Sequence, residues 1–130
     1  MAERNTPWKG GELISLLVAA STTIEAGKMV SVNSGGYAIP AADTASTIVV
    51  GVAQESVVNS GANGAASVVV RRLKAFKFAN GTTAVTQAGV GGNVVVQDAQ
   101  TVTTAAAATN DIVAGKCLAV ESDGVWVWIA

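Results

Sequence analysis

The stretch IVAGKCLAVESDGVWVWI, residues 112–129, carries two runs of alternating side chains on either side of a short polar turn. Alternation with a period of two is typical of β-strands, and a Ser-Asp-Gly sequence between two such runs favours a reversal of the chain. The stretch therefore predicts a β-hairpin in which residues 112–121 and 125–129 pair around residues 122–124.

A second stretch repeats this pattern. Residues 24–39, IEAGKMVSVNSGGYAI, align without gaps with residues 112–127, and seven of the sixteen positions are identical. Both stretches contain an Ala-Gly turn, a lysine, an alternating strand and a Ser-x-Gly turn. We expect related hairpins at the two places. They reflect either the reuse of common turn chemistry or a pseudo-symmetric barrel with a hairpin at each end.

The rest of the chain favours the same class of structure. Short runs rich in Val and Thr recur between glycine-rich turns, and no segment keeps a helical period beyond about ten residues. We expect strands at residues 48–55 and 67–79, a turn at 22–28 and a loop at 59–66. The fold class is therefore all-β, a small β-sandwich or β-barrel. Residues 12–130 form a single β-domain, at a length that leaves room for two small sub-domains.

The first eleven residues, MAERNTPWKGG, are predicted to form an extended N-terminal arm. Pro7 blocks regular strand pairing, and Gly10 and Gly11 end the segment flexibly. Trp8 is unusual in so polar a segment, and we expect it to dock on its own domain or on a neighbouring molecule.

Charged residues are few and balanced, with eight basic and nine acidic side chains and a net charge of −1. A chain of this balance is not expected to bind nucleic acid, and its low charge favours contact between subunits. The apolar run at residues 13–20 is too short to cross a bilayer, and residues 1–12 lack the features of a signal peptide. We expect no membrane partner.

Catalytic groups are scarce in the sequence. It has no histidine and one cysteine, Cys117, in a strand-like context where a buried thiol is the simplest interpretation. No pattern of a metal site or an activated nucleophile is present. We expect a protein that is not an enzyme, with no catalytic residue, no cofactor and no metal.

A basic run, RRLKAFKF at residues 71–78, holds half of the basic side chains. In one continuous strand, Arg71 and Lys77 share a face, whereas Arg72 and Lys74 lie on the other face with two phenylalanines. Three interpretations stay open: a solvated edge strand, a stripe that docks on an acidic partner surface, and a groove for single-stranded nucleic acid.

Trp126 and Trp128 fall on one face of the predicted last strand, and three aliphatic side chains fall on the other. With both faces apolar, one face is expected to meet another subunit or the arm.

Several of these segments together resemble a known family. The segments IEAGKMV (24–30), VVGVA (49–53), VVV (94–96) and VWVWI (125–129) are similar in order and spacing to those of the decoration, or head cement, proteins of tailed-phage capsids. The resemblance implies a structural protein of the virion that binds the outer surface of the shell built by the major capsid protein. It also implies self-association, as a homotrimer in preference to a homodimer.

The resemblance further implies that the arm and the basic strand face the shell, with a tryptophan at a subunit contact. The expected capsid or subunit contacts are Trp8, Lys9, Arg71, Arg72, Lys74, Lys77, Trp126 and Trp128. Two alternatives remain: a carbohydrate- or receptor-binding module of a phage fibre or tail, and a tail-tube-type virion subunit. The first would need exposed tryptophans flanked by Asn, Asp or Gln.

Overall fold

The computed structural model describes residues 2–105 and 107–130, and within them it contains twelve strands and one short 3-10 helix. The expectation of an all-β fold is therefore confirmed. In chain order the elements are β1 Leu13–Leu17, β2 Thr22–Ile24, β3 Met29–Val32, β4 Ala38–Pro40, β5 Ile48–Ala53, β6 Val57–Asn59, β7 Ser67–Arg71, β8 Lys74–Asn80, η1 Gln87–Gly89, β9 Asn93–Asp98, β10 Thr101–Thr104, β11 Val113–Glu121 and β12 Gly124–Ile129.

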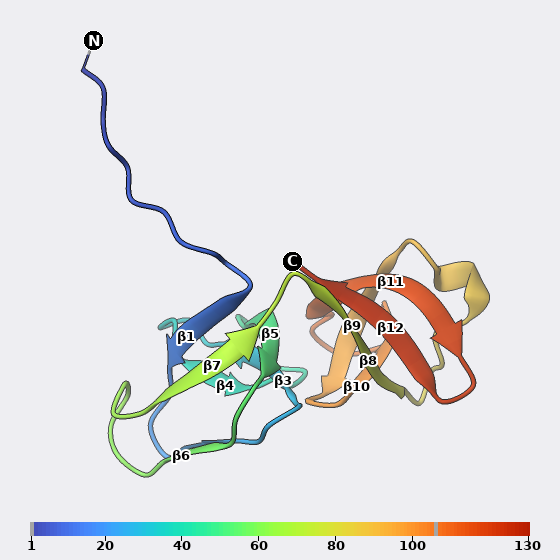
Figure 1. Cartoon of the computed structure of the whole chain (residues 1–130). Helices are drawn as coiled ribbons and strands as arrows, with labels where there is room; N and C mark the ends of the chain where they lie inside the picture. The colour runs from blue at the N-terminus through green and yellow to red at the C-terminus, as the bar shows by residue number, and fades with distance from the viewer. Residues whose placement is uncertain (1, 106) are drawn as a thin grey trace.

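The first half of the chain forms one lobe (Figure 1). Its main sheet is antiparallel, with the strand order β1-β7-β5-β3-β4, and β2 pairs separately with β6. An isolated bridge between Val18 and Ala38 joins the end of β1 to β4, so the sheet curls almost closed. Side chains inside this curl form a buried core of Val18, Ile24, Val30, Ala38, Ala53, Val68 and Val70.

The second half forms a closed five-stranded barrel with the order β10-β8-β12-β11-β9. The β8–β10 pairing is parallel and the other pairings are antiparallel. Closure removes the exposed edges that an open sheet would present. The chain passes from the first lobe to the barrel at Arg72 and Leu73, between β7 and β8.

The two lobes share apolar packing. Met29, Ala41 and Val52 belong to the first lobe but pack in the same buried cluster as the barrel core. The backbone N–H of Met29 also donates to the carbonyl oxygen of Ala99, at 2.8 Å. The barrel is therefore held against the first lobe by a continuous core.

Both predicted hairpins are confirmed: β3 pairs with β4, and β11 pairs with β12. They lie in different sheets, so they are not the two ends of one barrel. The described part of the predicted arm, residues 2–11, has no regular secondary structure and leads directly into β1.

The prediction of one strand over residues 67–79 is wrong. β7 ends at Arg71 and β8 begins at Lys74, because Leu73 adopts a left-handed conformation with φ of 58°. Because residues 71–78 do not form one strand, the prediction that their basic side chains alternate between its two faces is also wrong. Residues 22–24 and 57–59 form β2 and β6, which the turn and loop signals around them did not predict.

Candidate docking surface

The N-terminal arm is the most exposed segment of the molecule (Figure 1). It runs away from the first lobe, and the side chain of Trp8 is 92% exposed. Trp8 therefore does not dock on its own domain in this structure. A large aromatic side chain held in water is unfavourable, so the arm is suited to contact with another molecule.

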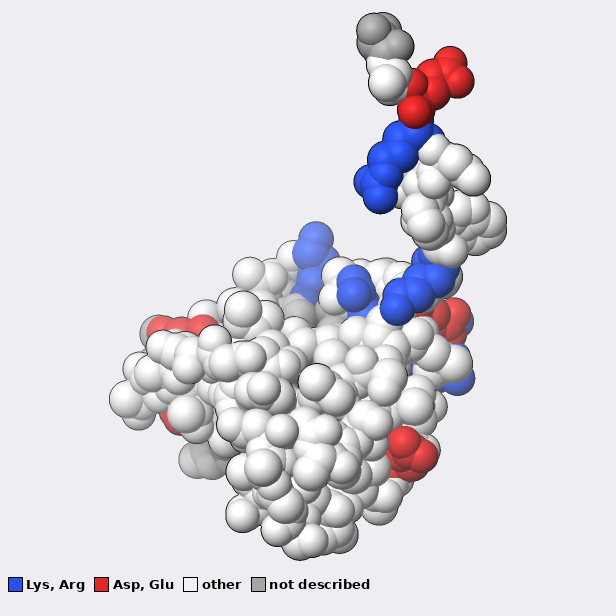
Figure 2. Space-filling model, turned by 90° about the vertical axis from the view of Figure 1, so that its left-hand side faces the viewer, with Lys and Arg blue, Asp and Glu red and all other residues white. Residues whose placement is uncertain are grey.

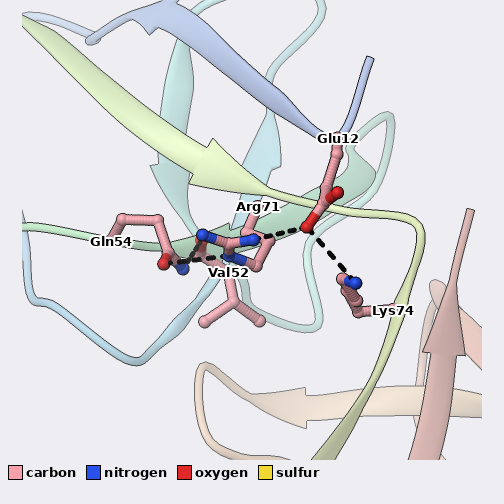
Figure 3. Close-up of polar contacts among 5 residues, drawn as sticks. All are labelled: Glu12, Val52, Gln54, Arg71 and Lys74. Carbon is pink, nitrogen blue, oxygen red and sulfur yellow. Dashed lines mark hydrogen bonds and ion pairs between the residues drawn. The ribbon is translucent and has the colours of Figure 1, made fainter. Parts of the chain in front are cut away.

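The root of the arm is an ion cluster that joins β1, β7 and β8 (Figure 3). The Glu12 carboxylate accepts from the guanidinium of Arg71 and lies 3.4 Å from Lys74 Nζ. Arg71 Nε also donates to Gln54 Oε1 at 3.2 Å, and Gln54 Nε2 donates to the carbonyl oxygen of Val52 at 3.2 Å. The cluster fixes the direction in which the arm leaves the fold.

The charge of this cluster affects the ionisation of Glu12. Partial desolvation opposes ionisation, but hydrogen bonds from Arg71 and Lys74, with their positive charges, hold the pKa of Glu12 below its ordinary value. Glu12 therefore stays ionised and offsets one of the two cations that touch it.

Two further basic residues lie near this ion cluster. The N–H of Arg72 donates to the carbonyl oxygen of Glu12 at 2.8 Å, and the buried Arg72 Nε has no hydrogen-bond partner among the described residues. Lys9 lies three residues before Glu12 in the arm. The predicted contacts Lys9, Arg71, Arg72 and Lys74 are thus gathered at the root of the arm.

The surface below this basic root carries little charge. Residues 13–70 contain four charged side chains, which are Glu25, Lys28, Asp43 and Glu55. Figure 2 shows Lys and Arg side chains at the base of the arm and a largely uncharged face beneath them. We call this face, formed by the first lobe and bounded by the basic root, the charge-poor face.

A second group of predicted contacts lies on the outside of the barrel. Trp126 is half-buried and Trp128 is 39% exposed, while their neighbours Val125, Val127 and Ile129 are buried, as the alternation predicted. Lys77 lies here rather than at the arm root, because β8 pairs it with Trp126. Of the eight predicted contacts, five therefore lie on the arm and at its root and three lie on the outside of the barrel, and Lys74, opposite Ile129, lies where the two groups adjoin.

Acidic side chains hold Lys77 in place. Lys77 Nζ lies 2.6 Å from Asp123 Oδ1 and 3.1 Å from Glu121 Oε1, and it is 5.9 Å from the centroid of the Trp126 ring. Trp126 Nε1 donates to Glu121 Oε1 at 2.9 Å. Hydrogen bonds from Lys77 to Asp123 and Glu121 raise the pKa of Lys77, and the Trp126 and Lys77 bonds lower the pKa of Glu121.

Glu12, Gln54 and Glu121 act in these clusters but were not predicted as site residues. Glu12 had a usable signal, since it is the first residue after the Gly-Gly end of the arm. Gln54 had none, because strand pairing brings it to Arg71. Glu121 had one, since it lies five residues before Trp126 across the predicted hairpin turn.

A polar hollow of about 410 Å³ lies at one side of the barrel, lined by Asp43, Thr82, Thr83, Gln97, Thr103, Ala107, Ala108 and Thr109. Among the described residues that line it, Asp43 alone is ionisable, and its carboxylate accepts the backbone N–H groups of Thr109 and Asn110, both at 2.8 Å. These bonds lower the pKa of Asp43. Its carboxylate is therefore engaged in holding a loop of the second lobe.

Other reactive chemistry is sparse in the described residues. Cys117 is buried, and desolvation raises the pKa of its thiol, so the reactive thiolate is disfavoured. Across residues 2–105 and 107–130, no three His, Cys, Asp or Glu side chains cluster as metal ligands would. The same residues contain no helix long and apolar enough to span a membrane.

Comparisons of this chain with protein-family models, with curated proteins and with solved structures found no match.

Proposed function

We propose that this protein is a structural subunit of a phage virion that binds the outer surface of the capsid shell and stabilises it. The proposal rests on the resemblance of its hairpin segments to decoration proteins and on the surface around the arm root. The single observation that carries it is the charge-poor face, which is bounded by the basic root of the projecting arm.

The charge-poor face supports binding to another protein. Cores of protein interfaces are depleted in charged side chains, whereas Arg and aromatic residues are enriched in them. Along β1 the face exposes Leu13 and Leu17, next to the basic root that contains Arg71 and Arg72. Such a surface favours the major capsid protein over a nucleic acid, which would need many unpaired cations.

Trp128 and the apolar side chains near it support contact between copies of the chain. Leu118, on the part of β11 that pairs with β12, is 45% exposed, and Trp128 is 39% exposed. Self-association would cover them, and a repeated lattice of shell sites would hold several copies side by side.

Mixing the purified protein with empty expanded shells of the cognate major capsid protein, followed by electron-microscopic imaging, tests the proposal. We expect added density at regular positions on the outer surface. Shells that gain no density would contradict the proposal.

A variant with two charge reversals tests whether the arm root contacts the shell. Arg72→Glu combined with Lys74→Glu places negative charge at the arm root and should lower occupancy of the shell. Lys116→Glu reverses one charge on the barrel opposite Trp128, so it reports on the proposed contact between copies and not on the arm root. Equal occupancy for all three proteins would show that the basic root does not face the shell.

The carbohydrate-binding alternative gains no support from the neighbours of the tryptophans. Across the strands, Trp126 lies opposite Lys77 and Ala119, and Trp128 lies opposite Ala75 and Lys116. Asn, Asp and Gln side chains, which would bind sugar hydroxyls, do not occupy these cross-strand positions, and the nearby Asp123 is engaged by Lys77. A tail-tube role remains testable, because it requires rings of the isolated protein.

A further inference from the structure

Two apolar surfaces of the chain stay open to water, and they lie on different parts of the molecule. One is the side chain of Trp8 on the arm, which is almost fully exposed. The other is the outer side of the barrel along β11 and β12, where Leu118 and Trp128 are exposed. Both surfaces contain a tryptophan, the residue type most enriched where proteins bind one another.

Strand pairing builds the barrel surface. The residues opposite the outward-facing tryptophans of β12 include Ala119, across from Trp126, and Ala75, across from Trp128. Because alanine side chains are short, the two indole rings stand above their neighbours. A bulge in β11 leaves Leu118 as an extra, exposed residue beside them. We call these five residues the tryptophan face.

One end of the tryptophan face carries an excess of negative charge. At the turn between β11 and β12, Lys77 Nζ contacts both Glu121 and Asp123. Among the described residues, no second cation forms an ion pair with either carboxylate, and their side chains are 50% and 73% exposed. Two negative charges therefore meet one positive charge. This acidic tip, Glu121 and Asp123, is open to a further cation.

The arm presents the complementary side chains next to each other. Trp8 is followed directly by Lys9, and both are exposed. A lysine ammonium group sits on a long, flexible stem, so it can bend toward the side on which the neighbouring indole docks. The arm thus combines a large apolar group with a positive charge, whereas the tryptophan face combines apolar groups with an excess negative charge.

We propose that Trp8 and Lys9 of one copy dock on the tryptophan face of a second copy. The indole of Trp8 packs beside Leu118 and Trp128, and the ammonium group of Lys9 binds at the acidic tip. The inference rests on the self-association included in the proposed function, and it names the segment that makes the contact.

The spacing of the two surfaces agrees with this contact. Leu118 and Glu121 are three residues apart on β11, which is roughly 10 Å in a strand. The Cα atoms of Trp8 and Lys9 are about 3.8 Å apart, and their two long side chains can diverge to span the remaining distance. One short segment of the arm therefore reaches both parts of the site.

The arm of the same chain is poorly placed for this contact. Its root is tied to Lys74, which pairs with Ile129, and β12 runs from there back to Gly124, roughly 16 Å away at the acidic tip. Lys9 precedes Glu12 by three residues, roughly 10 Å of extended chain. The backbone of Lys9 therefore stops short of its own acidic tip, and the arm extends away from the barrel (Figure 1).

The contact joins two different surfaces, so it is heterologous. In a closed assembly each copy gives one arm and receives one arm. The contact uses residues of the arm beyond its root, and Arg71, Arg72 and Lys74 stay free to face a shell.

Mixing two defective variants of the full-length chain tests the proposal. Trp8→Ala removes the docking group of the arm but leaves the tryptophan face intact. Leu118→Lys places a cation on the tryptophan face but leaves the arm intact, and the position is exposed, so the core is not disturbed. Trp128→Ala is a second variant of the face, and circular dichroism verifies that each variant is folded.

Light scattering should show that the unmodified chain exceeds the monomer mass of 12.9 kDa and dissociates on dilution. Each single variant should self-associate roughly tenfold more weakly or worse. An equimolar mixture of Trp8→Ala and Leu118→Lys should form a heterodimer at concentrations where each variant alone is a monomer, because one supplies the face and the other the arm.

Three results would overturn the proposal. An unmodified chain that stays monomeric at every concentration would show that no second copy binds, as when the arm covers its own face. Self-association of Trp8→Ala equal to that of the unmodified chain would mean that the copies meet without the arm. A mixture no heavier than its separate components would exclude a heterologous contact.

Reversal of the charge on the arm tests the role of the acidic tip. Lys9→Glu should weaken self-association by roughly tenfold, whereas Arg4→Glu, the same change elsewhere on the exposed arm, should have little effect. Equal effects of the two substitutions would remove Lys9 from the contact. No shell is present in these measurements, so a chain that binds shells but stays monomeric would contradict this inference alone.

Discussion

Gly115 of β11 lies so close to the backbone of β12 that no side chain fits there. A Cβ atom at this position would overlap the carbonyl oxygen of Trp128 and lie 2.8 Å from Val127 Cγ1. The neighbours belong to the barrel wall and its core, so they cannot move aside cheaply.

Gly115→Ala should therefore lower the free energy of unfolding by about 1–3 kcal/mol, the usual range for overpacking a core. Urea denaturation monitored by far-UV circular dichroism measures this change. Gly10→Ala is the control, because a Cβ at Gly10 meets no atom within 4 Å. Equal stability of the two variants would contradict the packing argument.

The hydrogen bonds of Asp43 predict how the stability of the fold depends on pH. Its pKa is lowered by the backbone N–H groups of Thr109 and Asn110, so the folded state favours the ionised form. The resulting stability is fully present above the ordinary pKa of the carboxyl group and is lost as pH falls through the lowered pKa. Acidification should therefore release the loop that Asp43 holds only once the pH falls below the ordinary pKa of the carboxyl group, about 3.9, and through its lowered pKa.

Asp43→Asn tests this linkage. Urea unfolding between pH 7 and pH 2.5 should show a smaller loss of stability on acidification in this variant than in the unmodified chain. Asp98→Asn is the control, because Asp98 accepts one N–H, from Gln100 of its own turn. An unchanged pH dependence in Asp43→Asn would exclude Asp43 as the group responsible.

At the scale of elements, the break between β7 and β8 is set by Leu73. Its N–H donates to Ile129 O at 2.7 Å while its φ is 58°, a conformation that side-chain-bearing residues adopt at a cost. The bend turns the chain from the first lobe into the barrel. A regular strand over residues 67–79 would prevent the barrel from closing beside the first lobe.

Substitutions at Leu73 should report this backbone strain. Leu73→Val should unfold with a free energy about 1–2 kcal/mol lower than Leu73→Gly, because a β-branched side chain disfavours the left-handed region that glycine adopts readily. Denaturant midpoints of the two variants measure the difference. A Val variant as stable as the Gly variant would mean that this conformation is not required.

At the scale of the whole molecule, the shared core predicts that both lobes unfold together. Met29 lies in the first lobe but is fully buried in the cluster that fills the barrel. Met29→Ala should lower the free energy of unfolding by about 2–5 kcal/mol, as other large-to-small core substitutions do.

Two probes test whether this loss is cooperative. Tryptophan fluorescence reports mainly on Trp126 and Trp128 in the barrel, and far-UV circular dichroism reports on both lobes. Their midpoints should coincide in Met29→Ala and in Val68→Ala, a control in the core of the first lobe. Separate midpoints would show that the lobes unfold independently.

Local pattern was enough to predict the all-β class, the arm, the two hairpins and the burial of Cys117. Each of these depends on residues close together in the chain: alternation determines which side of a strand is buried, and turn residues determine where it reverses. The alternation of Trp126 and Trp128 with buried aliphatic residues followed for the same reason.

The features that local pattern did not predict depend on contacts between residues far apart in the chain. The bend at Leu73 exists because its N–H reaches Ile129, and the ion cluster exists because β1 and β7 bring Glu12 to Arg71. Pairing of β8 with β12 places Lys77 opposite Trp126, where Glu121 and Asp123 hold its Nζ. The sequence by itself determined local geometry and sidedness, whereas only the tertiary structure decided which surfaces meet, because pairing partners depend on how the whole chain packs.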